Sequence, residues 1–463
     1  MTDLSHLLQP DRGQSARMIH IVDPNGFDAW LNQQPPRHRA AATAQKLTPS
    51  GFSSAILPGD GAEDWSVVTV VANVDSLSPW CLAKLAETLP EGQYRVEGRD
   101  PGAAMFGWVT GQYRFERYRK EDRATGPRVL LSSDPVAIEE TLRQGSATLR
   151  VRDMVNTPAA DMGPGEIEAA AAELAKQQGA ELTVTRGTEL ERGFPMIAIV
   201  GQAAAKGREP RLIELAWGRA DQPKIAIVGK GVCFDTGGLD LKNSAGMRLM
   251  KKDMGGAAHA LALAELVMTA RLPVQLHLLI PAVENSIGAK AFRPGDVLAT
   301  RKGLTVENTN TDAEGRLILG DALARACEEA PELLIDFATL TGAARVALGP
   351  DLPALFANDD ALADALSAQG KAVSDPVWRL PLWDGYDEML KSDIADLVNA
   401  AEGGFAGSVT AALFLRRFVA KDVAWAHFDT FAWRPAARPG RPKGGEALGL
   451  RAAWGMLKQR YPR

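Results

Sequence analysis

The chain has 463 residues, of which 46% are hydrophobic and 24% are charged. That balance is normal for a globular protein with a substantial core, and the length predicts two or three domains of roughly 100–200 residues each. The formal net charge of −5 gives the chain no general attraction to nucleic acid or to anionic membranes. A nucleic-acid partner is therefore not expected.

Cysteine usage and the N-terminus indicate the compartment. Cys81, Cys233 and Cys327 are far apart and fit neither a disulfide framework nor a thiolate zinc site, which favours a reducing environment. The first residues lack the pattern of a signal peptide, and no apolar run reaches the roughly 18 residues of a membrane helix. We expect a soluble cytoplasmic protein without a membrane partner, and we expect Cys233 to be a small buried hydrophobe.

Residues 1–145 have the pattern of a smaller N-terminal α/β domain. The apolar stretches Trp65–Asn73 and Val129–Ser132 predict strands, and Trp80–Leu89 has the spacing of a helix. A further helix is predicted over Val136–Val155. The domain boundary is placed near residue 145, and no chemical motif indicates what the N-terminal domain does.

Residues 146–463 alternate strands with helices. Predicted strands are Met196–Val200, Leu212–Trp217, Lys224–Val228, Val274–Pro281 and Leu333–Phe337, and predicted helices are Glu166–Gln178, Met247–Arg271 and Ile318–Ala330. This order predicts a larger α/β domain with a mainly parallel central sheet flanked by helices. Lys230 and Thr339 closely follow predicted strands, so they fall at the sheet edge where ligands bind in such folds.

Four acidic residues of this larger domain lie among glycines and apolar residues: Asp235, Asp253, Asp312 and Glu314. Charged groups are rarely buried unless they are paired or bind a metal. Asp312 and Glu314 are two residues apart, so an extended backbone would place both side chains on one side. Asp253 precedes the pair Gly255-Gly256, which permits close helix packing and predicts a deeply buried carboxylate.

Converging carboxylates repel one another and take up protons unless cations are present. Two divalent cations about 3.5–4 Å apart would remove that repulsion. The six histidines show no metal-binding spacing, so the site would be rich in carboxylates and suited to Mn²⁺, Mg²⁺ or Zn²⁺. A neighbouring dication would favour the neutral amine of Lys230, which could then be a nitrogen ligand.

Each residue also has a plain structural alternative. Asp312–Arg316 alone would be an ordinary turn with an ion pair, and Lys242 alone would be a surface lysine. Gly229–Gly231 lacks the Walker pattern, so phosphate binding there is weakly supported. His427 is expected to be a hydrogen-bonded structural histidine. The full set is much less probable by chance than any member.

Several segments resemble the leucyl aminopeptidase family, the two-metal cytosol aminopeptidases. The main ones are Val228–Gly238, Met250–Gly256 and Asn310–Leu317, the last being similar to the family's signature octapeptide. Further similarity covers Asn156–Pro158, Ala338–Ala343, Leu380–Trp383, Lys391–Asp396 and Gly407–Phe414. The resemblance spans roughly residues 150–430 and does not reach residues 1–145.

The resemblance implies that residues 146–463 form the catalytic domain of an aminopeptidase. Such an enzyme releases the N-terminal amino acid, leucine or a broader set, from peptides with a free N-terminus through a metal-bridged water. It would bind two divalent cations per subunit, Mn²⁺ or Zn²⁺, and assemble as a homohexamer. The implied ligands are Lys230, Asp235, Asp253 and Glu314 for one ion and Asp235, Asp312 and Glu314 for the other.

The resemblance also implies two catalytic residues. Lys242 would polarise the scissile carbonyl, and Arg316 would hold a bicarbonate ion that acts as the general base. Residues implied to line the pocket for the first side chain or to position the substrate are Met250, Asn310, Thr339 and Gly342. The segment Phe428–Trp433 is shorter and bulkier than the family pattern at the far wall of that pocket, so leucine preference does not carry over directly.

Two other classes of function are alternatives at the level of the sequence. One is a catalytically idle binding protein, such as a DNA-binding assembly factor, which the retained chemical residues and the negative net charge disfavour. The other is a two-metal phosphatase or nucleotide-binding enzyme, and the glycine loop around Lys230 fits the peptidase pattern better.

Overall fold

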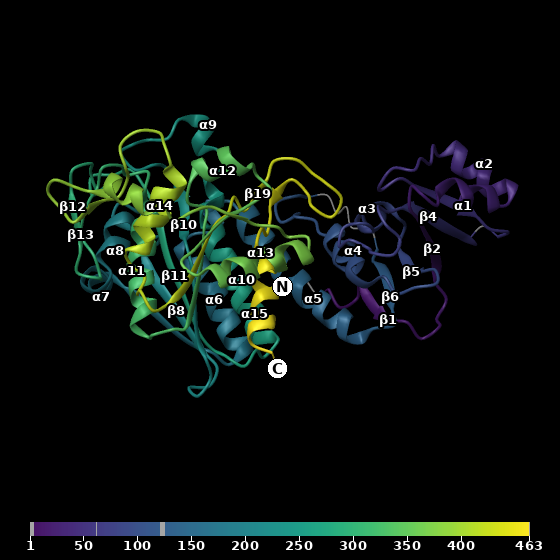
Figure 1. The fold of residues 1–463 in the computed structure, drawn as a ribbon, viewed down its shortest axis with the longest axis horizontal. Helices are drawn as coiled ribbons and strands as arrows, with labels where there is room; N and C mark the ends of the chain where they lie inside the picture. Colours follow the sequence, from purple (N-terminus) through teal and green to yellow (C-terminus); the bar gives the residue numbers. More distant parts are fainter. Residues whose placement is uncertain (1–3, 62, 121–125, 463) are drawn as a thin grey trace. The chain divides into compact units, whose positions relative to one another are not determined.

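The computed structural model describes residues 4–61, 63–120 and 126–462. The chain divides into two compact units, each with its own sheet and buried core (Figure 1). The first unit comprises Met1–Leu149 and Ala436–Lys443, and the second comprises Arg150–Pro435 and Gly444–Arg463. Within the described ranges, no helix is both long and apolar enough to cross a membrane.

The first unit is built on a sheet with the strand order β1-β6-β5-β2-β4-β3. Its strands are β1 (Leu8–Pro10), β2 (Arg17–Val22), β3 (Ser54–Pro58), β4 (Trp65–Val70), β5 (Gly92–Val96) and β6 (Arg128–Ser132). Its helices include α1 (Phe27–Gln33), α2 (Pro36–Ala44), α3 (Ala83–Thr88) and α4 (Met105–Gly111). The strand β3 pairs antiparallel with β4, whereas β2, β5 and β6 pair in parallel. The predicted mixed α/β character of this region is confirmed.

A loop from late in the chain belongs to the first unit. It connects β19 (Trp433–Arg434) and β20 (Gly444–Gly445), which pair antiparallel. In this loop, Arg441 Cζ lies 4.4 Å from the ring centroid of Trp80. The amide of Gly440 donates a 2.8 Å hydrogen bond to Glu87 Oε1. The loop is thus packed, in addition to being rich in proline and arginine.

The second unit is organised around a larger sheet with the order β16-β15-β18-β14-β9-β11-β8-β7, and β10 also pairs with β11. Its strands are β7 (Glu181–Arg186), β8 (Arg211–Trp217), β9 (Lys224–Gly229), β10 (Gly231–Asp235), β11 (Gln275–Asn285), β14 (Leu333–Ala338), β15 (Ala354–Ala357), β16 (Trp378–Arg379) and β18 (Ala424–Asp429). The central strands β11, β9, β14 and β18 run in parallel, and β7, β8 and β15 pair antiparallel. A separate small sheet contains β12 (Val297–Ala299), β13 (Thr305–Glu307) and β17 (Leu397–Val398). The predicted mainly parallel sheet is confirmed.

Helices cover both faces of this sheet (Figure 1). The helices of the second unit are α6 (Pro164–Gln178), α7 (Gly187–Gly193), α8 (Pro195–Gly201), α9 (Ser244–Met247), α10 (Gly255–Thr269), α11 (Glu314–Glu328), α12 (Gly342–Leu348), α13 (Asp360–Ala372), α14 (Gly407–Arg416) and α15 (Leu450–Arg460), and α5 (Pro135–Asn156) begins in the first unit and ends in the second. On one face, α10 packs so closely on β9 that a Cβ at Gly229 would lie 2.6 Å from Ala260 Cβ. On the other, Ala226 and Val228 of β9 share a buried core with Leu319 of α11.

The prediction of a strand at Met196–Val200 was wrong, because these residues form α8. Pro195 occupies the first turn of the helix, where its missing N–H is not needed. The carboxylate of Asp321 accepts a 2.8 Å hydrogen bond from the Met196 amide and so satisfies an otherwise unpaired helix N-terminus. A short apolar run does not distinguish a strand from a buried helix. Here the hydrogen bond from the distant Asp321 stabilises the helical alternative.

The predicted helix over Met247–Arg271 is interrupted. The chain forms the short helix α9, then a 3₁₀ turn over Met250–Met254, and only then α10. Asp253 therefore lies in the 3₁₀ turn that leads into α10. The prediction that glycines allow close packing here is confirmed, because a Cβ at Gly256 would lie 2.2 Å from the Phe337 carbonyl oxygen.

Candidate active site

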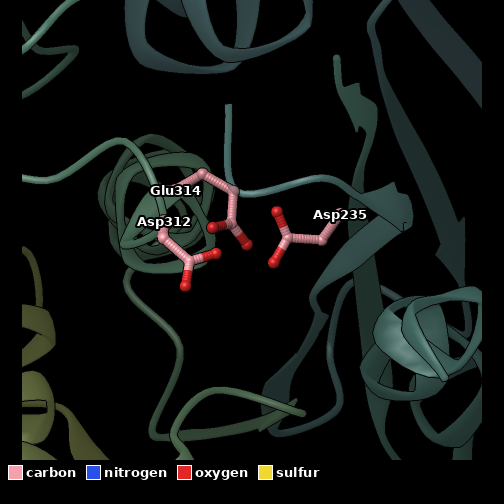
Figure 2. A group of neighbouring side chains, drawn as sticks. All are labelled: Asp235, Asp312 and Glu314. Carbon is pink, nitrogen blue, oxygen red and sulfur yellow. The ribbon is translucent and has the colours of Figure 1, made fainter. Parts of the chain in front are cut away.

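Three of the predicted acidic residues converge at the carboxyl edge of the central sheet. Figure 2 shows the carboxylates of Asp235, Asp312 and Glu314 pointing toward one another. Each of the three residues offers a ligand atom, and these atoms lie within 4.8 Å of one another. Asp235 ends β10, whereas Glu314 is the first residue of α11. The Asp312–Arg316 segment is therefore a turn running into a helix, not the extended backbone considered from the sequence.

Asp235 is held in place by its neighbours. Its Oδ1 accepts hydrogen bonds from the Gly237 amide at 2.9 Å and from Asn285 Nδ2 at 2.9 Å. Gly237 has a φ of +88°, a conformation that L side chains rarely adopt, so glycine is required in this turn. Asn285, at the end of β11, also donates to the Thr311 carbonyl at 3.0 Å and thereby links Asp235 to the Asp312 turn.

Lys230 joins the fourth acidic residue to this group. Its Nζ lies 2.7 Å from Asp253 Oδ2 and 3.0 Å from Glu314 Oε1, and its side chain is 3% exposed. Burial by itself would lower the pKa of Lys230, but attraction by Asp253, Glu314 and Asp235 outweighs burial and holds that pKa above its usual range. The side chain fits because residue 315 is glycine: a Cβ at Gly315 would lie 2.5 Å from Lys230 Cε.

Lys242 lies on the more open side of the group. Its Nζ is 2.8 Å from Asp235 Oδ2 and also pairs with Asp312, and its side chain is 15% exposed. Burial would lower its pKa, but Asp235 and Glu314 raise that pKa above the usual range. Lys242 is therefore an ion-paired residue of the site and not a surface lysine.

The two lysines do not fully compensate the acidic residues. Burial, together with repulsion by Asp235, raises the pKa of Glu314 to about 8 and the pKa of Asp312 to about 6. Glu314 Oε2 is buried and has no hydrogen-bond partner among the described residues. A group of carboxylates with raised pKa values and an unpartnered oxygen is suited to cations of higher charge.

Asp253 has a different environment. Burial would raise its pKa, but the charges of Lys230 and Lys252 lower it below the usual range. Its Oδ1 accepts a 2.7 Å hydrogen bond from Thr339 Oγ1 and lies 3.2 Å from Lys252 Nζ. Asp253 thus connects Lys230 to the loop that follows β14.

Arg316 lies two residues after Glu314 and is buried, and one of its N–H donors has no hydrogen-bond partner among the described residues. Its Nη1 donates a 2.7 Å hydrogen bond to the Asn399 carbonyl, while its buried Nε has no hydrogen-bond partner among the described residues. Burial lowers the pKa of Arg316 to about 10, and Glu314 opposes that shift, so the side chain remains a cation at neutral pH. A small anion would satisfy the unpartnered donor.

These side chains line one cavity of about 490 Å³. All the residues expected to bind metal, act in catalysis or contact substrate border it: Lys230, Asp235, Lys242, Met250, Asp253, Asn310, Asp312, Glu314, Arg316, Thr339 and Gly342. Thr339 follows β14 directly and Gly342 begins α12, so one wall is built by the loop at the end of β14. Asp429 anchors this loop by accepting hydrogen bonds from the amides of Leu340 and Thr341 at 3.0 and 3.1 Å.

Sequence reasoning missed several residues of the site. Lys252 and Arg345 border the cavity, and Asn285 orients Asp235. Asn285 could have been found as a polar residue that closes a long apolar strand. Lys252 was not selected from the sequence because it is adjacent to Asp253, which already accounted for that segment. Arg345 was not selected because a single arginine on a helix is ordinarily a surface residue.

The structural roles expected for two other residues are confirmed. Cys233 is 0% exposed, as expected of a small buried hydrophobe. The ring Nδ1 of His427 forms a 2.6 Å hydrogen bond with Asp336 Oδ1, and both side chains are buried. His427 is a structural residue of β18.

Comparison with known proteins identifies the family. Residues 150–453 match the model of the cytosol aminopeptidase family, catalytic domain, and residues 18–131 match that of the M17 aminopeptidase N-terminal domain. The chain belongs to the cytosol aminopeptidase family. This family member is thus an aminopeptidase, a hydrolase that acts on peptides, and the resemblance stated from the sequence is confirmed. The expectation that the resemblance stops short of residues 1–145 was wrong, because residues 18–131 also match the family. The phosphatase alternative is disfavoured.

Individual relatives agree with this assignment. The aminopeptidase is 41% identical over 370 residues to a probable cytosol aminopeptidase of Syntrophotalea carbinolica, an alignment that covers 76% of this chain and 74% of that one. It is similar to the crystal structure of the cytosol aminopeptidase of Coxiella burnetii, with 44% identity, a TM-score of 0.92 and coverage of 98% and 99% of the two chains. The bottromycin maturation enzyme BotP in complex with Mn has 30% identity, a TM-score of 0.86 and coverage of 96% and 100%.

Proposed function

We propose that this aminopeptidase is metal-dependent and binds two divalent cations, Mn²⁺ or Zn²⁺, in the cavity at the sheet edge. One ion would be held by Lys230, Asp235, Asp253 and Glu314, and the other by Asp235, Asp312 and Glu314. The observation that carries the proposal is the convergence of three carboxylates whose ligand atoms lie within 4.8 Å of one another. The Mn in the BotP structure supports a divalent cation of this kind.

The donor set fits such ions. Carboxylate oxygens and an amine are ligands for Mn²⁺ and Zn²⁺, and the buried Glu314 Oε2 without a hydrogen-bond partner is a free ligand atom. In the structure, Lys230 supplies the positive charge between Asp253 and Glu314. An ion in that position would replace the ammonium charge and leave a neutral amine as ligand.

Two divalent cations would supply Lewis acidity toward the scissile carbonyl and activation of a water molecule. The residues around them have separate tasks. Lys242 would donate to the oxygen that becomes negative in the transition state, because its ammonium borders the cavity beside Asp235. Arg316 would hold a bicarbonate ion as general base through its unpartnered Nε. Met250, Asn310, Thr339 and Gly342 would contact the substrate.

The proposal extends to the whole chain. We place catalysis in residues 146–463 and the cleavage site at the first peptide bond of peptides with a free N-terminus. A homohexamer in the cytoplasm is proposed on the family resemblance. No role in catalysis is assigned to residues 1–145.

The test is turnover of leucyl-4-methylcoumaryl-7-amide after exhaustive chelation and after addition of Mn²⁺ or Zn²⁺, with bound metal counted by mass spectrometry. Chelation should abolish activity, and the ions should restore it at two per chain. Glu314→Gln, which preserves the side-chain shape and removes its charge, should lose metal and activity together.

Glu189→Gln is a matched control, because Glu189 is exposed on α7, away from the cavity. It should keep both ions and normal turnover. Full activity in metal-free protein would overturn metal dependence, and unchanged metal content in Glu314→Gln would remove Glu314 from the ligand set.

A further inference from the structure

Two cations in the cavity have no task in the chemistry described above. Lys252 lies in the 3₁₀ turn before α10 and is 1% exposed, and Arg345 lies on α12 and is partly buried. Both border the same cavity as the carboxylates. The proposed metal and Arg316 sites give Arg345 no role, and they involve Lys252 only as a neighbour of Asp253, 3.2 Å from its Oδ1.

The two cations lie close to one aromatic ring. Arg345 Cζ is 4.7 Å from the ring centroid of Phe431, and Lys252 Nζ is 5.8 Å from it. Phe431 belongs to the segment Phe428–Trp433, which departs from the family pattern at the far wall of the side-chain pocket. The Phe431 ring therefore stabilises the charges of Arg345 and Lys252 at that wall through cation–π interactions.

Arg345 has no carboxylate partner among the described residues, and the one carboxylate that pairs with Lys252 is shared. Among the described residues, no acidic side chain forms an ion pair with Arg345, and its Nη1 donates only a 3.3 Å hydrogen bond to the Thr341 carbonyl. Lys252 shares Asp253 with Lys230 and Thr339. Clustered positive charge in a partly desolvated cavity is unfavourable without an anion, so an incoming carboxylate would be stabilised there.

The position of Arg345 identifies which part of a substrate would meet it. A Cβ at Gly342 would lie 3.5 Å from Arg345 Nη2, so the guanidinium lies against Gly342. Gly342, Thr339 and Met250 are among the residues implied above to line the pocket for the first side chain or to position the substrate. The guanidinium is thus placed to contact the end of that side chain.

We propose that this enzyme prefers peptides whose first residue is acidic, with Arg345 binding the side-chain carboxylate of aspartate or glutamate and Lys252 adding a second positive charge. This inference rests on the proposed function, because it assumes that the cavity receives the N-terminal residue. Phe431 positions the two cations by packing beneath them.

The test compares kcat/KM for the 4-methylcoumaryl-7-amides of glutamate, aspartate, glutamine and leucine. These substrates lack a C-terminal carboxylate, so any preference for acid arises at the first side chain. Glutamate should exceed glutamine by about 10- to 100-fold, the range expected for a hydrogen bond to a charged group. Arg345→Met should reduce that ratio to near one, and Arg345→Glu should make the glutamine amide a better substrate than the glutamate amide.

Arg379→Met is a matched control, because Arg379 pairs with Asp360 and does not border this cavity. It should keep the wild-type glutamate-to-glutamine ratio. Equal rates for glutamate and glutamine in the wild type, or an unchanged ratio in Arg345→Met, would overturn the inference while leaving the aminopeptidase function intact.

A binding measurement separates failure of the inference from failure of the proposed function. If none of the amides is hydrolysed, the proposed function fails, and calorimetric titration with free L-glutamate and L-glutamine still tests the pocket. L-Glutamate should bind at least tenfold more tightly than L-glutamine, and Arg345→Met should lose the difference. Equal affinities would overturn the inference on their own.

Discussion

The substitution Lys242→Ala distinguishes a catalytic lysine from a metal ligand. In the structure the Lys242 ammonium lies 2.8 Å from Asp235 Oδ2 and pairs with Asp312. Metal ions bound by those carboxylates would take over as their counter-charge and leave the ammonium available to the substrate. We therefore expect Lys242→Ala to keep two metal ions per chain and to lose rate.

The size of the loss follows from the role. Removing one charged donor from the site of the developing oxyanion typically lowers kcat by about 10²–10³, or about 2.7–4 kcal/mol. KM should change much less, because the donor acts mainly in the transition state. Without metal, the same substitution leaves Asp235 and Asp312 without their shared counter-ion. The destabilisation should be about 1–3 kcal/mol, below the roughly 3–5 kcal/mol of a fully buried pair, because the Asp312 side chain is 33% exposed.

The assay combines kcat and KM on an aminoacyl amide, metal content, and thermal unfolding with and without Mn²⁺. Lys290→Ala, at an exposed position, controls for loss of a positive charge. Lys230→Ala is the contrasting variant and should lose one metal ion. The reasoning fails if Lys242→Ala loses a metal ion or retains near-normal kcat.

Three further outcomes are expected. Gly315→Ala places a Cβ 2.5 Å from Lys230 Cε, so it should weaken binding of one metal ion in a chelator-competition titration; unaltered affinity would argue against Lys230 as a ligand. Gly256→Ala meets the rigid Phe337 carbonyl at 2.2 Å and should destabilise by about 1–3 kcal/mol or more in urea unfolding, whereas Gly51→Ala, with nothing within 4 Å, should not. The pKa of Glu314 is raised from its ordinary 4.5 to about 8, so its contribution to metal-free stability is complete below pH 4.5 and is lost as pH rises through about 8. Because a metal ion competes with that proton, the affinity for the metal ion should rise by up to about tenfold per pH unit toward pH 8. Calorimetry in two buffers measures the protons released on metal binding. A metal affinity that does not change with pH would contradict this prediction.

Much of the sheet edge could be predicted because its signals are local. The strands β9 and β14 are short apolar runs, and Lys230 and Thr339 follow them closely. Parallel strands bring their carboxyl ends to one edge whatever the loops do, so residues distant in sequence could be expected to meet there. The convergence of Asp235 with Glu314 follows the same logic, even though α11 begins earlier than the periodicity indicated.

The remaining features depend on contacts that the sequence does not display. Asp321 caps α8 from 125 residues away, and a run that reads as a strand becomes a helix. Arg345 and Lys252 meet at Phe431 only because three separate segments pack together. Each of these residues has an ordinary local role, so their shared location becomes visible only in three dimensions.

The loop Ala436–Lys443 bears on whether the catalytic unit can exist as an independent fragment. Deleting residues 1–149 alone would remove Trp80 from beneath Arg441 and Glu87 from the Gly440 amide, and would leave the loop stranded on the remaining fragment. Arg434 and Gly444 lie directly opposite each other in the β19–β20 register. A two-residue Asn-Gly turn inserted between them should therefore close the hairpin and replace the loop. A fragment that contains only the second unit therefore requires removal of this loop as well as of residues 1–149. A fragment truncated near residue 149 alone would be less stable than the second unit by itself.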